Sequence, residues 1–298
     1  MSLRRRHLPR GWYPDDPVSL RGLVTDWIPA AGLGVAAGGI AVAAVAPHAG
    51  WTFSGRLATM AAASLAYAFP PVQDPEGGGT LVVFGGHLPP GARPLAAGET
   101  SYDTPLGALD ADIALLHALE AVVGLGRDEE PDNTVEVLLP MVAAIFPGIR
   151  VLWLRAPNDG AAVELGEAVS AAGLSMGRRV ACLGSTDLTH YGPNYGFSPH
   201  GTGRAAEAWV RDTNDRRFIE ALLDMDSTEA LRLAQAERSA CSAGAAAAAL
   251  AFARSRGASR ATLLGYATSL DVRRDDSFVG YAAVAFQKQG DDPKPRRP

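Results

Sequence analysis

The sequence predicts a single α/β domain with a central, mostly parallel sheet covered by helices on both faces. Short apolar runs alternate with longer helical patterns along the chain. The 298 residues, 47% hydrophobic and 20% charged, are enough for one large core. Because no stretch rich in Gly, Ser or Pro divides the chain, we expect an N-terminal arm (1–30), one α/β domain (31–289) and a flexible tail (290–298).

The first thirty residues are expected to be extended. Residues 4–6 are all arginine and precede Trp12, Tyr13 and Pro14, so aromatic side chains would pack this arm against the domain. Three arginines are too few for a nucleic-acid interface in a chain whose formal net charge is −5. We therefore expect a solvated N-terminus and no nucleic-acid partner.

The remaining elements follow in order from their hydrophobic periodicity. Four short apolar runs bounded by turn residues are predicted to be buried strands, at residues 40–46, 80–84, 150–154 and 180–183. Helical patterns are found at residues 57–68, 112–123, 135–146, 161–172, 204–224 and 239–254, the last of which is rich in alanine. Two further strands, 261–267 and 279–286, are expected to form a closing hairpin.

The number of cysteines and the hydropathy indicate the cellular compartment and whether a membrane span is expected. Two cysteines cannot form a disulfide framework, and no signal-peptide pattern is present, so we expect a reducing cytoplasm. The longest apolar stretch, residues 33–46, is too short for a bilayer and is broken by glycines. No membrane span is expected.

Three of the six histidines follow predicted strands, two of them directly. These are His48, His87 and His190, each in a glycine-containing loop. Ligands of open α/β sheets gather outside the carboxyl ends of the strands, so the sequence predicts that these imidazoles share one site. The other histidines lie in the arm, in a helical pattern and in a turn, and are expected to be structural; they are His7, His117 and His200.

A cysteine and an aspartate complete the set of candidates. Cys241 stands at the start of the alanine-rich pattern, where a helix N-terminus would lower the thiol pKa. Cys182 lies inside an apolar strand and is expected to be an inert core residue. Asp187 precedes His190 by three residues, so its carboxylate can orient that imidazole or share a proton with it. It can also cap its own turn.

Several longer motifs stand in a fixed order along the chain. Residues 47–55 read PHAGWTFSG and residues 185–193 read STDLTHYGP. Together with the blocks at residues 104–107, 134–140, 266–269 and 279–283, these motifs resemble the Memo family, which includes protein B of the AmmeMemoRadiSam system. The resemblance runs from about residue 40 to residue 286.

The resemblance implies a fold similar to class III extradiol dioxygenases and one pocket lined by two histidines, a cysteine and an Asp–His pair. Carried onto this sequence, the metal ligands are His48, His87 and Cys241, and the catalytic pair is Asp187 and His190. Two imidazoles and a thiolate suit one divalent or redox-active ion, with iron or copper favoured and zinc possible.

The chain departs from the family pattern beside three of these residues. Gly86 precedes His87 where many members have Gly-Pro-Ser-His-His, and Asn133 stands in a block that often reads Glu-His-Ser. Ser242 follows Cys241 where Gly-Arg-Gly is usual. Substrate preference therefore does not transfer from the family.

Three functions remain open from the sequence. The first is a metal-dependent redox enzyme similar to extradiol ring-cleavage dioxygenases. The second is a metal-free hydrolase or acyltransferase, with Cys241 attacking and His190 as base, although no oxyanion motif is recognised. The third is a non-catalytic module that binds a peptide or small ligand in the pocket.

Overall fold

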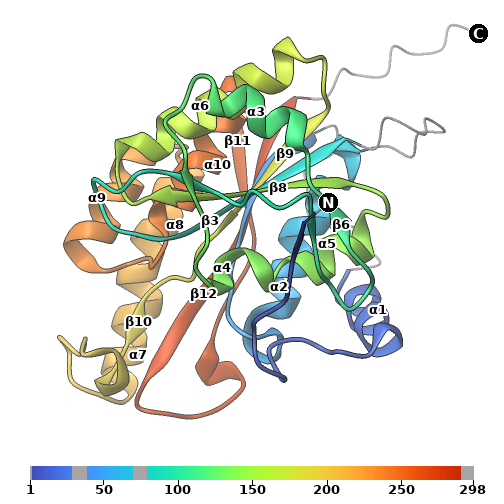
Figure 1. Ribbon diagram of the computed structural model, residues 1–298. Helices are drawn as coiled ribbons and strands as arrows, with labels where there is room; N and C mark the ends of the chain where they lie inside the picture. The colour runs from blue at the N-terminus through green and yellow to red at the C-terminus, as the bar shows by residue number, and fades with distance from the viewer. Residues whose placement is uncertain (1, 29–38, 70–78, 290–298) are drawn as a thin grey trace, which may run out of the picture.

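The centre of the fold is a four-stranded parallel sheet, seen in a computed structural model that describes residues 2–28, 39–69 and 79–289 (Figure 1). Its strands lie in the order β2 (Gly39–Ala46), β9 (Val180–Ser185), β3 (Thr80–Leu88) and β8 (Arg150–Pro157). All four predicted runs are strands; β2 begins one residue early, and the other three run past their predicted last residues. The mostly parallel α/β fold is confirmed.

Further strands lie at both edges of this parallel sheet. Beyond β2 lies β12 (Phe278–Gln289), antiparallel to β2 and also to β11 (Arg260–Thr268) and β10 (His190–Tyr191). The predicted closing hairpin is therefore present. At the other edge lie β4 (Leu95–Ala96) and β7 (Gly126–Arg127), whereas β1 (Leu3–Arg4), β5 (Ser101–Tyr102) and β6 (Leu109–Asp110) form a small separate sheet.

Apolar side chains alternate between two cores, one on each face of the sheet. In β3, Val82 and Phe84 belong to one hydrophobic cluster, and Leu81 and Val83 belong to the other. The first face is covered by helices that include α3 (Ile113–Glu120), α6 (Gly160–Ser175), α8 (Asp215–Leu223), α9 (Ser227–Glu237) and α10 (Ala243–Ser255). The second is covered by α1 (Pro17–Trp27), α2 (Trp51–Ser64) and α5 (Leu139–Ile145).

The alanine-rich helix α10 packs unusually close to its neighbours. A Cβ on Gly166 of α6 would lie 2.1 Å from the carbonyl oxygen of Ala248, and a Cβ on Gly244 would lie 2.0 Å from that of Pro157. Only glycine permits these approaches. The close packing fixes the start of α10, and Cys241 just before it, against the ends of β8 and β9.

Several elements differ from the sequence prediction. The arm is not wholly extended, because α1 begins after the N-cap Asp16 and ends at Trp27. The predicted helix 135–146 is split into α4 (Asn133–Glu136) and α5, with Pro140 in the first turn of α5. Helix 204–224 is α7 (Arg204–Trp209), a π-helical turn (Val210–Asn214) and α8.

Two further differences concern helix boundaries and helices that were not predicted. Helix α2 begins six residues before the predicted start and ends in a 3₁₀ turn, Leu65–Ala68. Helix α9 was not predicted, although Asp226 caps it. The predicted tail and the predicted boundary between arm and domain lie outside the described residues. In the described part of the chain, no helix combines the length and apolar character needed to cross a bilayer.

Candidate metal centre

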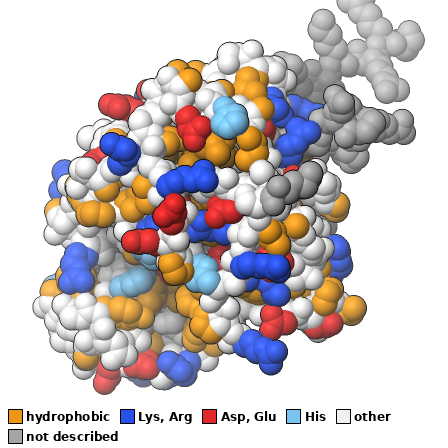
Figure 2. All heavy atoms as spheres, viewed as in Figure 1, with side chains coloured by type: hydrophobic (Ala, Val, Ile, Leu, Met, Phe, Trp, Pro, Cys, Tyr) orange, Lys and Arg blue, Asp and Glu red, His pale blue; other side chains and the backbone are white. Residues whose placement is uncertain are grey.

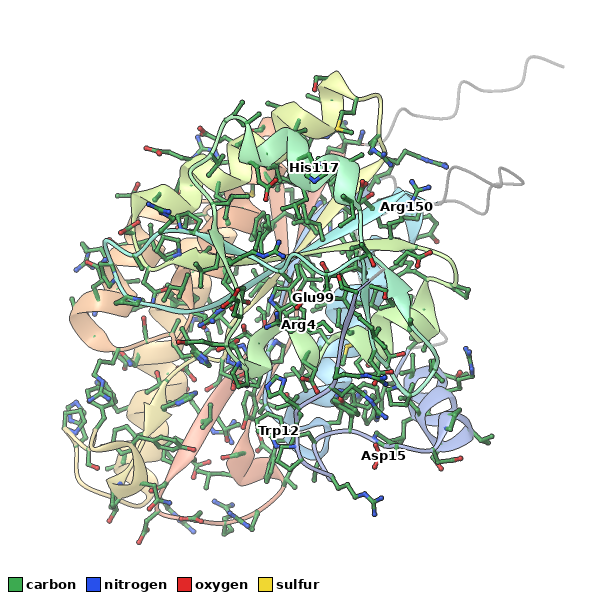
Figure 3. All side chains as sticks on the ribbon, viewed as in Figure 1. Arg4, Trp12, Asp15, Glu99, His117 and Arg150 are labelled. Atoms are coloured by element: carbon green, nitrogen blue, oxygen red, sulfur yellow. The ribbon has the colours of Figure 1, made fainter. Side chains whose placement is uncertain are left out.

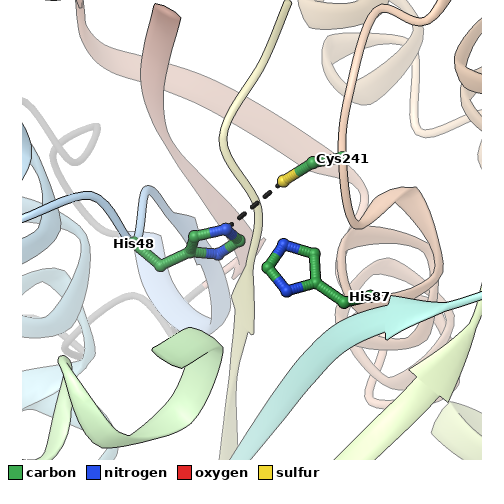
Figure 4. Close-up of side chains that lie close together, drawn as sticks. All are labelled: His48, His87 and Cys241. Atoms are coloured by element: carbon green, nitrogen blue, oxygen red, sulfur yellow. Dashed lines mark hydrogen bonds between the residues drawn. The ribbon is translucent and has the colours of Figure 1, made fainter. Parts of the chain in front are cut away.

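Three potential metal ligands from distant parts of the sequence meet at the carboxyl ends of the parallel strands. His48 follows β2, His87 lies near the end of β3 and Cys241 precedes α10. One ligand atom from each residue lies within 4.8 Å of the other two, and both imidazoles face the sulfur (Figure 4). The structure therefore brings together all three residues that the sequence analysis named as ligands.

The environment of His48 leaves one ring nitrogen available. Its side chain is buried, and its Nδ1 lies 2.9 Å from Ser185 Oγ. The Ser185 hydroxyl donates its proton to the carbonyl oxygen of Thr134, so it accepts from His48 Nδ1–H. The lone pair of the neutral ring then lies on Nε2, which is 3.3 Å from Cys241 Sγ.

His87 is oriented by a buried charge network. Its Nδ1 lies 3.0 Å from Asp132 Oδ2, and Arg155 lies 3.4 Å from the same carboxylate. Arg155 also donates to the carbonyl oxygen of Gly86 and pairs with Asp128 at 3.1 Å. Burial opposes protonation, but the Asp132 hydrogen bond and the Cys241 sulfur together raise the pKa of His87 to about 10.

Helix α4 connects the two histidines. Asp132, its N-cap, holds the His87 ring, while Asn133 Nδ2 donates to the carbonyl oxygen of His48 at 3.2 Å. Thr134 accepts from Gly86 N–H at 3.1 Å and, through its carbonyl, from Ser185. The positioning roles of these residues were not predicted from the sequence. The available signal was Asp132, a helix-capping residue just before the matched block at residues 134–140.

The Cys241 sulfur is surrounded by imidazoles rather than placed on a helix end. Helix α10 begins at Ala243 with Ser242 as N-cap, so Cys241 lies before the helix, contrary to the prediction. Burial would raise the pKa of the thiol, but His48, His190 and His87 hold it well below its ordinary value. Cys182 is fully buried in β9, and burial raises its pKa.

Asp187 and His190 lie close to the three candidate ligands. Asp187 Oδ1 accepts from His48 N–H at 2.7 Å, and its Oδ2 lies 3.9 Å from Nε2 of both His48 and His190. The His190 Nε2 atom is buried and has no hydrogen-bond partner. Burial lowers the pKa of His190, but Asp187 and Cys241 raise it to about 10. Asp187 also serves the backbone, because its carbonyl accepts from Cys241 N–H.

The other three histidines lie outside this group. His7 in the arm pairs with the buried Glu136, and His200 packs on Trp209 with ring centroids 4.4 Å apart. His117 lies on α3, at the opposite end of the view from Trp12 (Figure 3). This separation agrees with the structural roles expected for them.

A cavity of about 630 Å³ opens over the histidines. Its floor includes His48, His87, Asp187 and His190, and its walls come from the arm, α2 and the loop between β11 and β12. Figure 2 shows histidine side chains beside a hollow in the lower half of this face. A volume of this size fits a small organic molecule.

Comparison with known proteins identifies the family. The family model described as "Memo-like protein" matches residues 4–285. The chain belongs to the Memo-like family. A MEMO1 family protein of Thermococcus onnurineus (strain NA1) is 30% identical over 83% of this chain and 87% of its own, and one from Methanococcoides burtonii is 31% identical over 82% and 85%.

A solved structure of an uncharacterized Escherichia coli K12 protein has a TM-score of 0.46 and 12% identity to this Memo-like chain, covering 83% of it and 98% of the E. coli chain.

Proposed function

We propose that this Memo-like protein binds one metal ion through His48, His87 and Cys241 and acts as a metal-dependent oxidoreductase similar to extradiol ring-cleavage dioxygenases. The observation that carries the proposal is the convergence of three ligand atoms within 4.8 Å. They come from the ends of two parallel strands that flank β9 and from the segment before a helix, which favours a ligand site over accidental packing.

The donor set fits such an ion. With its Nδ1–H bonded to Ser185, the deprotonated His48 ring presents a lone pair on Nε2, and the Cys241 pKa favours the thiolate, which is the form that binds metals. A thiolate and two imidazoles suit iron or copper, with zinc possible. Three protein ligands leave a coordination position open towards the cavity. A bound ion would supply redox chemistry there.

His190 and Asp187 are suited to proton transfer beside that position. The ring nitrogen His190 Nε2 lacks a protein partner, and Asp187 lies too far away, at 3.9 Å, for a hydrogen bond. His190 can therefore hold a proton at Nε2 and exchange it with a molecule in the cavity, while the Asp187 charge stabilises the imidazolium.

Metal analysis of purified, untagged protein tests the proposal. We expect about one ion per chain for the wild type, because the described residues contain one such ligand set. His48→Ala, His87→Ala and Cys241→Ala should each lose most of it, and His117→Ala on α3 should retain it. Equal metal content in all five proteins, in preparations that remain folded, would contradict the proposed ligands.

A metal-free cysteine hydrolase is the second candidate, because Cys241 Sγ lies 3.3 Å from His48 Nε2. His48 would then be the base, rather than His190 as the sequence suggested. Ester hydrolysis that survives exhaustive chelation and disappears in Cys241→Ser would favour this candidate. Loss of activity on chelation would favour the metal enzyme.

A further inference from the structure

Two arginines from different segments of the chain line the cavity. Arg10 belongs to the N-terminal arm and Arg273 to the loop between β11 and β12, and both line the cavity. Their side chains are 97% and 72% exposed. Arg10 lies 3.7 Å from Asp15, and Arg273 lies 3.5 Å from Asp275.

These contacts are longer than several ion pairs on the helical surface. Arg216 lies 2.8 Å from Glu220, and Arg232 lies 2.6 Å from Glu229. A guanidinium held by one distant carboxylate keeps most of its donors for another acceptor. The two cavity arginines are therefore able to bind an additional anion.

The backbone that carries each arginine is fixed. On the arm, His7 N–H, Leu8 N–H and the Tyr13 hydroxyl all donate to the buried carboxylate of Glu136. The carbonyl oxygen of Trp12 accepts from Trp51 N–H at 2.7 Å. These bonds flank Arg10 on both sides, so its position at the cavity is built into the fold.

The second wall is held in a similar way. Arg273 N–H donates to the carbonyl oxygen of Ser269 at 2.9 Å, at the end of a 3₁₀ turn (Ser269–Asp271). The side chains of Thr268 and Asp271 cap this turn reciprocally. The loop therefore presents Arg273 from a defined turn.

Aromatic rings line the same cavity. Trp12, Phe53 and Tyr195 all contribute to its walls, and the Tyr195 ring lies 4.9 Å from that of His190 at the floor. Flat apolar surfaces of this kind bind planar molecules by stacking and burial. The cavity lining thus combines aromatic rings and two arginines with the histidines at the floor.

We propose that the substrate of this site is a small planar organic anion. Its carboxylate or phosphate group would bind between Arg10 and Arg273, and its unsaturated body would pack on Trp12, Phe53 and Tyr195. This inference rests on the proposed function only for the position of the substrate's reacting end, which would lie over His48, His87 and His190. The arginine contacts themselves need no metal.

Metal-free protein provides the test, because anions cannot then bind through an ion. Chelator-treated wild type is titrated by calorimetry at low ionic strength with benzoate, phenyl phosphate, benzamide and benzylamine, which share a ring and differ in charge. We expect at least one of the two anions to bind about tenfold more tightly than benzamide and benzylamine, with the preference reduced by salt. Comparison of benzoate with phenyl phosphate identifies the preferred head group.

Arginine variants locate the contact. Arg10→Gln and Arg273→Gln should each reduce anion affinity about threefold or more, and the matched surface variant Arg216→Gln should leave it unchanged. The inference would be overturned if all four probes bound equally, or if neither anion bound at millimolar concentration. It would also be overturned if the variant carrying both Arg10→Gln and Arg273→Gln kept the same preference for anions. If the protein preferred anions but bound no metal in the metal analysis, the proposed function would be contradicted and the anion inference would stand.

Discussion

At the scale of single residues, the two cysteines differ in what surrounds their sulfur atoms. Three imidazoles favour the Cys241 thiolate, whereas the apolar interior around Cys182 favours the neutral thiol. In metal-free protein, iodoacetamide should therefore modify Cys241 at least about tenfold faster than Cys182. Peptide mass spectrometry measures both rates, and Cys241→Ser should abolish the fast reaction. A bound metal should protect Cys241. Equal rates in the folded protein would contradict a poised thiolate.

Asp215, at the start of α8, predicts a pH effect on stability. Burial raises its pKa from 3.8 to about 6, although bonds from Thr189 and Tyr266 oppose the rise. Because the folded-state pKa is raised, Asp215 stabilises the fold fully below pH 4, and this contribution is lost as pH rises through 6. Relative to Asp215→Asn, the wild type should lose about 2 kcal/mol of unfolding free energy between pH 4 and pH 7.

Denaturant titrations at several pH values measure this difference. Tyr266→Phe removes a hydrogen bond to Asp215 Oδ2, so the loss should move to higher pH in that variant. A difference between wild type and Asp215→Asn that does not change with pH would show that this carboxyl titrates as in the unfolded chain.

At the scale of elements, α4 holds the two histidines in place. Asp132 and Asp226 are both N-caps, of α4 and α9, but only Asp132 also contacts a proposed ligand. Asp132→Asn should keep the cap yet weaken metal binding about 10- to 100-fold, because the carboxylate no longer orients His87. Asp226→Asn should leave affinity unchanged, and Asp132→Glu should restore part of it. Metal competition titrations provide the affinities, and equal affinities in both Asn variants would contradict the role of α4.

The elements also show how far the sequence could be interpreted. The central strands were predictable because they are short apolar runs, and the candidate ligand His48 because it directly follows one. His87 lies inside β3, which runs past the predicted end to Leu88, and His190 begins β10, so neither lies in the loop that the sequence suggested. Asp132 was not recognised as a ligand-orienting residue, because its contact with His87 spans 45 residues and depends on how α4 packs on β3. Helix α1 was missed although Asp16 and Pro17 are start signals, because the aromatic residues before it suggested an extended arm.

At the scale of the whole molecule, the N-terminal arm is bound to the domain by buried charges. Arg4 donates to the carbonyl oxygen of Glu130, lies over the Trp153 ring at 4.4 Å and lies beside Glu99 (Figure 3). Further along the arm, Glu136 accepts from two backbone N–H groups and Tyr13. The arm is therefore part of the cavity wall.

Glu136→Gln should loosen the arm. Replacing the carboxylate by a neutral amide weakens three bonds, so we expect about 2 kcal/mol lower unfolding free energy and faster tryptic cleavage within the arm of the native protein. Glu237→Gln removes only the partner of Arg217 in an exposed pair and serves as the control. An arm that is cleaved equally slowly in both variants would show that Glu136 does not hold it.

The coordination shell of the bound metal tests the central claim most directly. X-ray absorption spectroscopy of the metal-loaded protein measures which atoms surround the ion and at what distance. For a zinc-loaded sample we predict one sulfur ligand at about 2.3 Å and two imidazole nitrogens at about 2.0–2.1 Å, with the sulfur lost in Cys241→Ala. A shell of oxygen and nitrogen alone in the wild type would contradict a site built from His48, His87 and Cys241.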